Sequence, residues 1–167
     1  MTRTWLAFAC CWLALLLTAC GGPPAKSANP TRRLDERRAV EIIAKAFRAE
    51  RDQPVPGEPI QLADGKALEV DIVASGRKYG VAYLTENERR NLGAALPPRD
   101  RTQGDALQLV RGVGDDEDAT VLVLHDVDYV HDDHVGSGRS ASTITAERKL
   151  ERDVRDFVVR AHAERWR

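Results

Sequence analysis

Histidine and aspartate gather between positions 125 and 134, where the chain reads His-Asp-Val-Asp-Tyr-Val-His-Asp-Asp-His. Three of the four histidines of the chain lie in this stretch. Imidazole nitrogens and carboxylate oxygens together suit zinc, manganese or nickel. His125, Asp128, His131 and His134 are therefore candidate ligands of a divalent metal, although their spacing matches neither His-Glu-x-x-His nor an EF-hand loop. A structural role is the alternative, with His125 hydrogen-bonded in the core or at its rim and residues 131–134 in a solvated loop.

Two further groups contain reactive residue types without the pattern that their chemistry requires. Residues 115–118 read Asp-Asp-Glu-Asp, but calcium loops need spaced ligands and a glycine turn, so a solvated loop is predicted. Ser137, Ser140 and Ser142 could act as nucleophiles with a neighbouring histidine as base, but no nucleophile-elbow pattern surrounds them. The sequence therefore predicts no catalytic residue.

A cysteine follows an apolar segment near the start of the chain. Arg3 precedes an apolar run over residues 5–17, which is too short to span a bilayer as a helix. The run ends in Leu17-Thr18-Ala19-Cys20 and resembles the lipobox of bacterial lipoproteins. The resemblance implies a signal peptide over residues 1–19, cleavage before Cys20, a diacylglyceryl thioether on its sulfur and an acyl chain such as palmitate on its amino group. Gly21, in place of the Asp that retains lipoproteins at the inner membrane, implies the outer membrane, facing the periplasm.

The remaining chain divides into a tether and one domain. Residues 20–30 hold the lipidated cysteine and a flexible Gly/Pro/Ser-rich segment, and residues 31–167 form a single periplasmic domain. Cys10 and Cys11 lie in the predicted signal, so the domain itself has no thiol for a disulfide or a zinc–thiolate site. A formal net charge of −1 and 5% aromatic residues argue against a nucleic-acid partner.

Hydrophobic periodicity and a capping box together predict three helices. Val40, Ile43 and Phe47 recur at helical spacing within residues 32–50. Thr85-x-x-Glu88 is a capping box that starts a short helix, which Pro97-Pro98 ends. A final helix is predicted from the apolar series Leu150, Val154, Phe157, Val158 and Ala161.

Alternating residues predict strands around these helices. Strands near 60–62, 68–74 and 79–83, with a hairpin turn at Asp64-Gly65, form an antiparallel meander. A short strand covers residues 107–110, and Thr120–Val130 is apolar on both faces in its first half, which indicates a central strand. The predicted class is α+β: a mixed or antiparallel sheet, made of a β-meander plus one central strand, with N-terminal and C-terminal helices packed on it.

This order of elements resembles the core of the restriction-endonuclease-like nucleases, over about residues 35–130. That family holds Mg²⁺ with an Asp on one strand and Glu-x-Lys on the next. Asp71 lies on the second meander strand, but the next strand reads Val-Ala-Tyr-Leu-Thr at residues 81–85. The resemblance therefore implies the fold without its catalytic site, and Asp71 is predicted to be a solvent-facing strand residue.

These observations predict a membrane-anchored lipoprotein that binds another envelope protein and needs no cofactor. The exposed faces of the two long helices and the edge formed by residues 126–142 are the expected contact surfaces. The alternative is a metal-dependent hydrolase or metal-binding lipoprotein that uses the cluster from His125 to His134.

Overall fold

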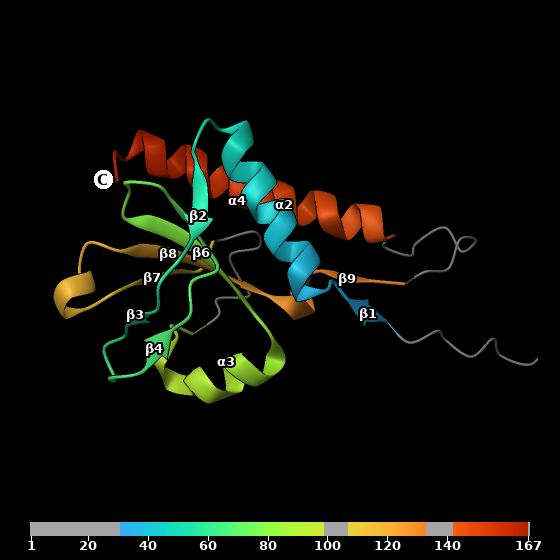
Figure 1. Cartoon of the computed structure of the whole chain (residues 1–167). Helices are drawn as coiled ribbons and strands as arrows, with labels where there is room; N and C mark the ends of the chain where they lie inside the picture. Colours follow the sequence, from blue (N-terminus) through green and yellow to red (C-terminus); the bar gives the residue numbers. More distant parts are fainter. Residues whose placement is uncertain (1–30, 99–106, 133–141, 167) are drawn as a thin grey trace, which may run out of the picture.

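A mixed five-stranded sheet in the order β2-β5-β6-β8-β7 forms the centre of the protein. The computed structural model describes residues 31–98, 107–132 and 142–166. β6 and β8 pair in parallel at the middle of the sheet, and the other neighbours pair antiparallel (Figure 1). The five strands are β2 (Pro54–Pro56), β5 (Ile72–Ala74), β6 (Tyr79–Leu84), β7 (Leu109–Arg111) and β8 (Thr120–His125).

The two central strands are buried on both faces. Every residue of β6 and β8 is buried. Tyr79, Val81 and Tyr83 of β6 belong to one hydrophobic core, whereas Ala82 and Leu84 belong to a second. Because successive side chains of a strand point to opposite faces, the sheet separates these two cores.

Two long helices, α2 (Glu36–Ala49) and α4 (Thr143–Ala163), cover the first face of the sheet (Figure 1). Each follows a residue whose side chain can accept from the free N–H groups of a helix start. The Asp35 side chain accepts from the Arg38 N–H at 3.2 Å, and the Ser142 side chain accepts from the Thr145 N–H at 3.3 Å. Phe47 and Phe157 are fully buried between the helices and the sheet. Burial of these amphipathic faces therefore holds both helices in place.

The second face is covered by shorter elements. These are α3 (Glu86–Leu92), the 3₁₀ turn η1 (Gly93–Ala95) and a hairpin of β3 (Ile60–Gln61) and β4 (Ala67–Leu68). Gly65 has a positive φ in the hairpin turn, a conformation that glycine adopts without steric cost. The predicted Asp64-Gly65 hairpin is therefore confirmed.

A two-stranded ribbon lies beside the sheet. β1 (Arg32–Arg33) pairs antiparallel with β9 (Val130–His131). Two further 3₁₀ turns, η3 (Gly114–Asp116) and η4 (Asp126–Asp128), precede and follow β8. The ribbon brings the start of the described chain next to the segment that leaves η4.

The α+β class with a mixed sheet and terminal helices is confirmed, and several boundaries differ. The first helix starts at Glu36 because residues 32–33 pair with β9. The central strand ends at His125, where η4 interrupts it. The hairpin forms its own two-stranded sheet instead of joining a meander. β2 takes that place at the sheet edge, where prolines are tolerated because one side of the strand needs no N–H donors.

Candidate functional site

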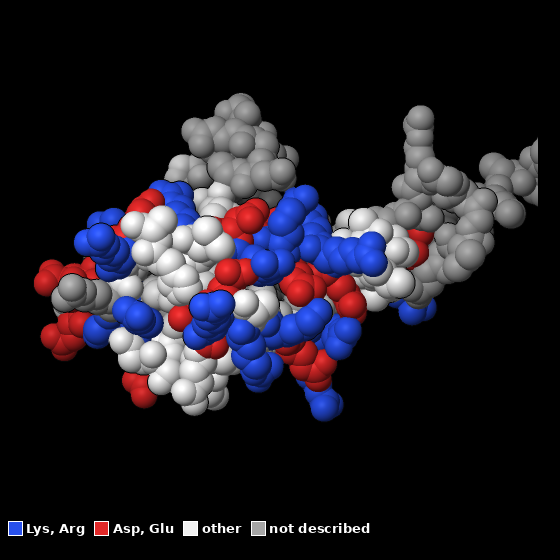
Figure 2. All heavy atoms as spheres, turned by 90° about the horizontal axis from the view of Figure 1, so that it is seen from above, with Lys and Arg blue, Asp and Glu red and all other residues white. Residues whose placement is uncertain are grey.

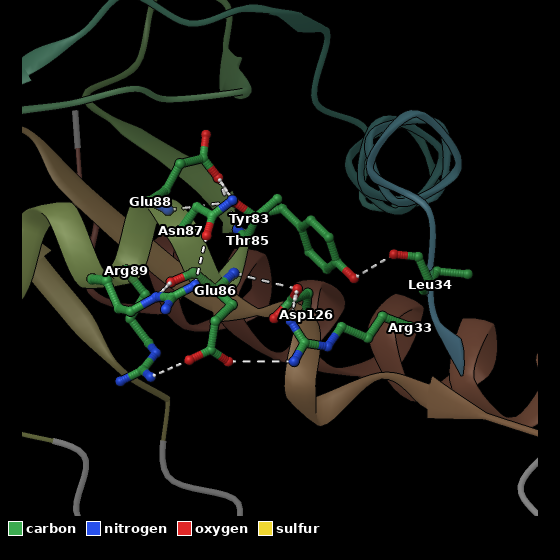
Figure 3. A network of polar contacts seen from close by, with 10 residues as sticks. Arg33, Leu34, Tyr83, Thr85, Glu86, Asn87, Glu88, Arg89 and Asp126 are labelled. Carbon is green, nitrogen blue, oxygen red and sulfur yellow. Dashed lines mark hydrogen bonds and ion pairs between the residues drawn. The ribbon is translucent and has the colours of Figure 1, made fainter. Parts of the chain in front are cut away.

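Polar side chains meet at the carboxyl ends of β6 and β8, the position at which open parallel strands commonly bind ligands. Leu84 lies opposite His125 in the register. The chain then enters α3 after β6 and η4 after β8. Thr85, Glu86 and Asp126 therefore emerge side by side (Figure 3).

The start of α3 carries the predicted capping box. The Thr85 N–H donates to the Glu88 carboxylate at 2.8 Å, and the Glu88 N–H donates to the Thr85 hydroxyl at 3.4 Å. These reciprocal bonds satisfy two backbone donors that a helix start otherwise leaves without partners. The capping box is confirmed, and it fixes the direction in which α3 leaves β6.

Asp126 links three elements through one carboxylate oxygen. Its Oδ2 accepts from Arg33 of β1 at 2.8 Å and from the Glu86 N–H of α3 at 3.3 Å (Figure 3). Its side chain is only 9% exposed. Since a buried carboxylate needs partners, Arg33 and the Glu86 N–H together supply the hydrogen bonds that this position requires.

Glu86 extends the network toward solvent. Its carboxylate accepts from Arg89 at 2.9 Å and from Arg33 at 3.3 Å. The Arg89 guanidinium holds the pKa of Glu86 below its usual range, and the hydrogen bond to Asp126 raises the pKa of Arg33. Each of these charges faces an opposite charge. The group, here called the clasp, holds β1, α3 and η4 together and consists of Arg33, Glu86, Arg89 and Asp126.

A second set of bonds lies behind this clasp. The Tyr83 hydroxyl donates to the Leu34 carbonyl at 3.0 Å, and burial raises the pKa of that hydroxyl. The Tyr83 N–H donates to the Asp71 carboxylate at 2.7 Å. Asp71 is half-buried, and burial raises its pKa. The prediction that Asp71 faces solvent from a strand is wrong, because its carboxylate points inward and accepts the hydrogen bond from the Tyr83 N–H of β6.

The predicted metal ligands occupy different environments. His125 is buried, and its Nε2 contacts Gln108 Oε1 at 2.6 Å, which agrees with the interpretation as a hydrogen-bonded core residue. Asp128 is half-buried in η4, and His131 is buried on β9 opposite Arg32. His134 lies outside the described residues. Within residues 31–98, 107–132 and 142–166, no three His, Cys, Asp or Glu side chains group closely enough to hold a metal ion. The metal site stays a prediction.

The remaining sequence candidates have partly structural roles. Asp116 accepts from the Gln61 N–H at 3.0 Å, whereas Asp115, Glu117 and Asp118 line the exposed turn around it. Ser142 caps α4, and its hydroxyl lies 3.0 Å from that of Thr145. Ser137, Ser140 and Cys20 lie outside the described residues.

A polar cluster that the sequence does not predict lies where α2 and α4 end. The Tyr79 hydroxyl donates to Asp52, and His162 Nε2 lies 3.1 Å from the same carboxylate. The Tyr79 ring also lies edge-on to Phe157 and His162. Asp52 and His162 are 110 residues apart, so no local pattern indicates the contact.

The outer surface of α2 and α4 carries charges of both signs (Figure 2). Three ion pairs join the helices: Arg38–Glu147 at 2.7 Å, Lys45–Glu151 at 3.2 Å and Glu50–Arg155 at 2.7 Å. Two hollows lie along this surface. The first, lined by Ile42 and Ile144 among charged residues, is near the start of α4; the second, lined by Glu50, Arg155 and Val159, is toward its end.

Large apolar side chains are exposed at both ends of α4. Ile144 is 60% and Val159 52% exposed, and the only other exposed large apolar residue among those described is Val113, at 38%.

Comparison with known protein families, curated proteins and solved structures gives no match. The nuclease resemblance thus stays a prediction. No described helix is both long and apolar enough to cross a bilayer.

Proposed function

We propose that this protein is a lipoprotein of the bacterial cell envelope that works by binding another envelope protein. The observation that carries the proposal is the sequence Leu17-Thr18-Ala19-Cys20 after a short apolar run. Cys20 carries the lipid, residues 21–30 form the tether, and the α+β domain faces the periplasm from the outer membrane. A diacylglyceryl group and an N-linked acyl chain together place three acyl chains on Cys20, whereas stable anchoring normally needs about two lipid signals.

The second hollow on the α2–α4 surface is the proposed contact for the protein partner. Val159 is exposed there and is surrounded by Glu50, Arg152, Arg155 and Asp156. An apolar centre within a rim of charged residues is the usual composition of a protein–protein interface. Charges of both signs at the rim favour a partner whose surface carries complementary charges around an apolar residue.

The anchor is tested by labelling cells that express the full chain with radioactive palmitate. The wild-type protein is expected to incorporate label and to sediment with the outer membrane. Cys20→Ser is expected to lose the label, and Cys10→Ser is the matched control that retains it. An unlabelled wild-type protein would overturn the anchor.

The contact is tested in living cells with a photo-crosslinking residue at Val159. A single protein adduct is expected at this position and not at Val113, whose N–H bonds to Gln61 of the hairpin on the second face of the sheet. Arg152→Glu, a change at an exposed rim position, is expected to abolish the same adduct. Equal adducts at both positions, or persistence in Arg152→Glu, would contradict the proposal.

The metal-dependent alternative has its own readout. Near-stoichiometric divalent metal in the purified protein, lost when His131 and His134 are both replaced by Ala, would replace the binding proposal with the metalloprotein one. The measurement is elemental analysis of the full chain, together with thermal unfolding after chelation and metal addition.

A further inference from the structure

One end of the domain, here called the β1 end, is built from β1, β9 and the first turns of α2 and α4 (Figure 1). β1 pairs with β9, and the Leu34 N–H continues the pairing to the Tyr129 carbonyl at 3.0 Å. Arg38, in the first turn of α2, binds Glu147, in the second turn of α4. Just before β9, the Tyr129 hydroxyl donates to Asp153 at the middle of α4 at 2.9 Å. These contacts bring the four elements to one place.

The tether of the proposed lipoprotein enters the domain at this end. Residues 21–30 separate Cys20 from the segment that leads into β1. A flexible chain of that length has a mean span of roughly 15–20 Å and a maximum of about 35 Å. A domain of this size has a radius of gyration of about 14 Å, which corresponds to a sphere roughly 37 Å across. Because the mean span is shorter than the domain, the β1 end lies nearer to the bilayer than the opposite end does.

The β1 end exposes the side chain most suited to a lipid headgroup layer. Ile144, in the first turn of α4, is the most exposed large apolar residue among those described. It lines the first hollow together with Arg38, Ile42 and Arg148, which places it at the β1 end. Apolar side chains at a bilayer surface gain by leaving water, and neighbouring arginines bind lipid phosphates.

The charges that line the first hollow are balanced in sign, and two exposed arginines near Ile144 are available to bind anionic groups. Arg148 lies one turn along α4, and the Arg37 side chain of α2 is 91% exposed. Of the acidic neighbours, Glu147 is bound by Arg38, and Glu41 faces both Arg37 and Arg38. Asp35 and Glu36 lie at the start of α2, where the helix dipole favours them. The apolar contact and the projecting arginines therefore supplement the lipid anchor.

We propose that the first turn of α4, with Ile144 at its tip, contacts the headgroup layer of the membrane that holds Cys20. Arg37 and Arg148 then bind anionic headgroups, and α4 leads away from the bilayer. At the rise of an α-helix, Val159 lies about 22 Å further along α4 than Ile144. Val159 therefore faces the periplasm. This inference rests on the proposed lipid anchor, and it explains how the second hollow is kept open for a protein partner.

The test compares two positions on α4 that are matched in chemistry and exposure. Ile144→Cys and Val159→Cys are each labelled with the environment-sensitive fluorophore NBD in the lipidated full-length product. The protein is reconstituted into vesicles of phosphatidylethanolamine and phosphatidylglycerol at a ratio of about 3:1. The label at position 144 is expected to shift to the blue and to be quenched at least twofold by spin-labelled lipids. The label at position 159 is expected to keep its aqueous spectrum.

The outcomes separate this inference from the anchor. Quenching at neither position, at both equally, or only at position 159 would overturn the orientation while palmitate labelling still supports the anchor. Ile144→Asp and Val159→Asp provide a second measurement that depends on no fluorophore. Ile144→Asp alone is expected to make α4 more accessible to hydrogen exchange in vesicles, and equal effects would contradict the inference. Absence of palmitate would overturn both proposals.

Discussion

Asp126 shows how a single side chain fixes three elements. Its carboxylate accepts from Arg33 and from the Glu86 N–H, and it is nearly buried. Asp126→Asn keeps the shape but removes the charge that Arg33 requires. Because Arg33 is half-exposed and can rehydrate, the expected loss of unfolding free energy is about 1–2 kcal/mol. Urea denaturation of wild type and variant measures this difference.

The matched control is Asp115→Asn, which makes the same change at an exposed position in η3. Its expected effect is below about 0.5 kcal/mol. A loss at Asp126 no larger than the loss at Asp115 would show that the clasp contributes nothing to stability.

Asp71 makes a pH-dependent prediction at the same scale. Burial raises its pKa in the folded state, although its carboxylate accepts from the Tyr83 N–H. The unfolded chain therefore loses this proton at a lower pH than the folded protein does. As pH rises through the unfolded and then the folded pKa, the free energy of unfolding falls, because the folded protein must hold a buried charge. Asp71→Asn can still accept the hydrogen bond and has no such cost. The variant is expected to gain stability relative to wild type as the pH rises from acidic to neutral.

This difference is measured by urea denaturation at several pH values. Asp64→Asn, at an exposed position in the β3–β4 hairpin, is the control for a general loss of negative charge. If the free energy of unfolding of Asp71→Asn, relative to wild type, falls with rising pH, the burial argument is contradicted.

Local spacing explains which residue contacts the sequence can predict. The partners Thr85 and Glu88 are three residues apart, so their capping box is visible as a pattern. Arg33 and Asp126 are 93 residues apart, and Asp52 and His162 are 110 apart. The chain topology creates these contacts, and no periodicity in one segment indicates them.

At the scale of elements, the attachment of α2 and α4 depends on the core more than on their ion pairs. Phe157 is fully buried in the core that the helices share with the sheet, whereas the Arg38–Glu147 pair is partly exposed to water. Phe157→Ala is expected to cost about 3–5 kcal/mol through lost burial and cavity formation. Glu147→Gln is expected to cost at most about 1 kcal/mol.

Both variants are compared by chemical denaturation at low and at high salt. Only the difference between wild type and Glu147→Gln is expected to shrink with salt, because screening weakens exposed pairs. Equal losses for the two variants would mean that the ion pairs, and not the apolar face, hold the helices.

Hydrophobic periodicity predicts elements that bury one face. It does not predict short strands that form because their backbone pairs with a distant segment. The long helices follow from their apolar stripes, and the hairpin follows from Asp64-Gly65. β2 contains Pro54 and Pro56, and prolines at this place are typical of the end of a helix, so the sequence alone predicts no strand there. Antiparallel pairing with β5 makes the segment a strand. β1 consists of two exposed arginines that no strand pattern contains, and its partner β9 makes it a strand.

At the scale of the whole molecule, stability is concentrated in the middle of the sheet. β6 and β8 pair along their whole length between two cores, whereas the β1–β9 ribbon is a short ladder at the periphery. Amides buried between two cores exchange only when the domain unfolds, and peripheral ladders open locally. Arg33→Ala removes the bonds from β1 to Asp126 and Glu86. It is therefore expected to speed hydrogen exchange at Leu34, while the amides of β8 exchange as slowly as in wild type.

Hydrogen exchange followed by NMR distinguishes this local opening from a global effect. Arg111→Ala removes an exposed arginine from the other edge of the fold and is expected to leave Leu34 unchanged. If Arg33→Ala speeds β6, β8 and Leu34 by one common factor, the β1 end unfolds with the core. A selective effect instead means that the β1 end opens separately. In the proposed lipoprotein, tension on the tether would then reach the ribbon and its clasp before it reaches the central strands.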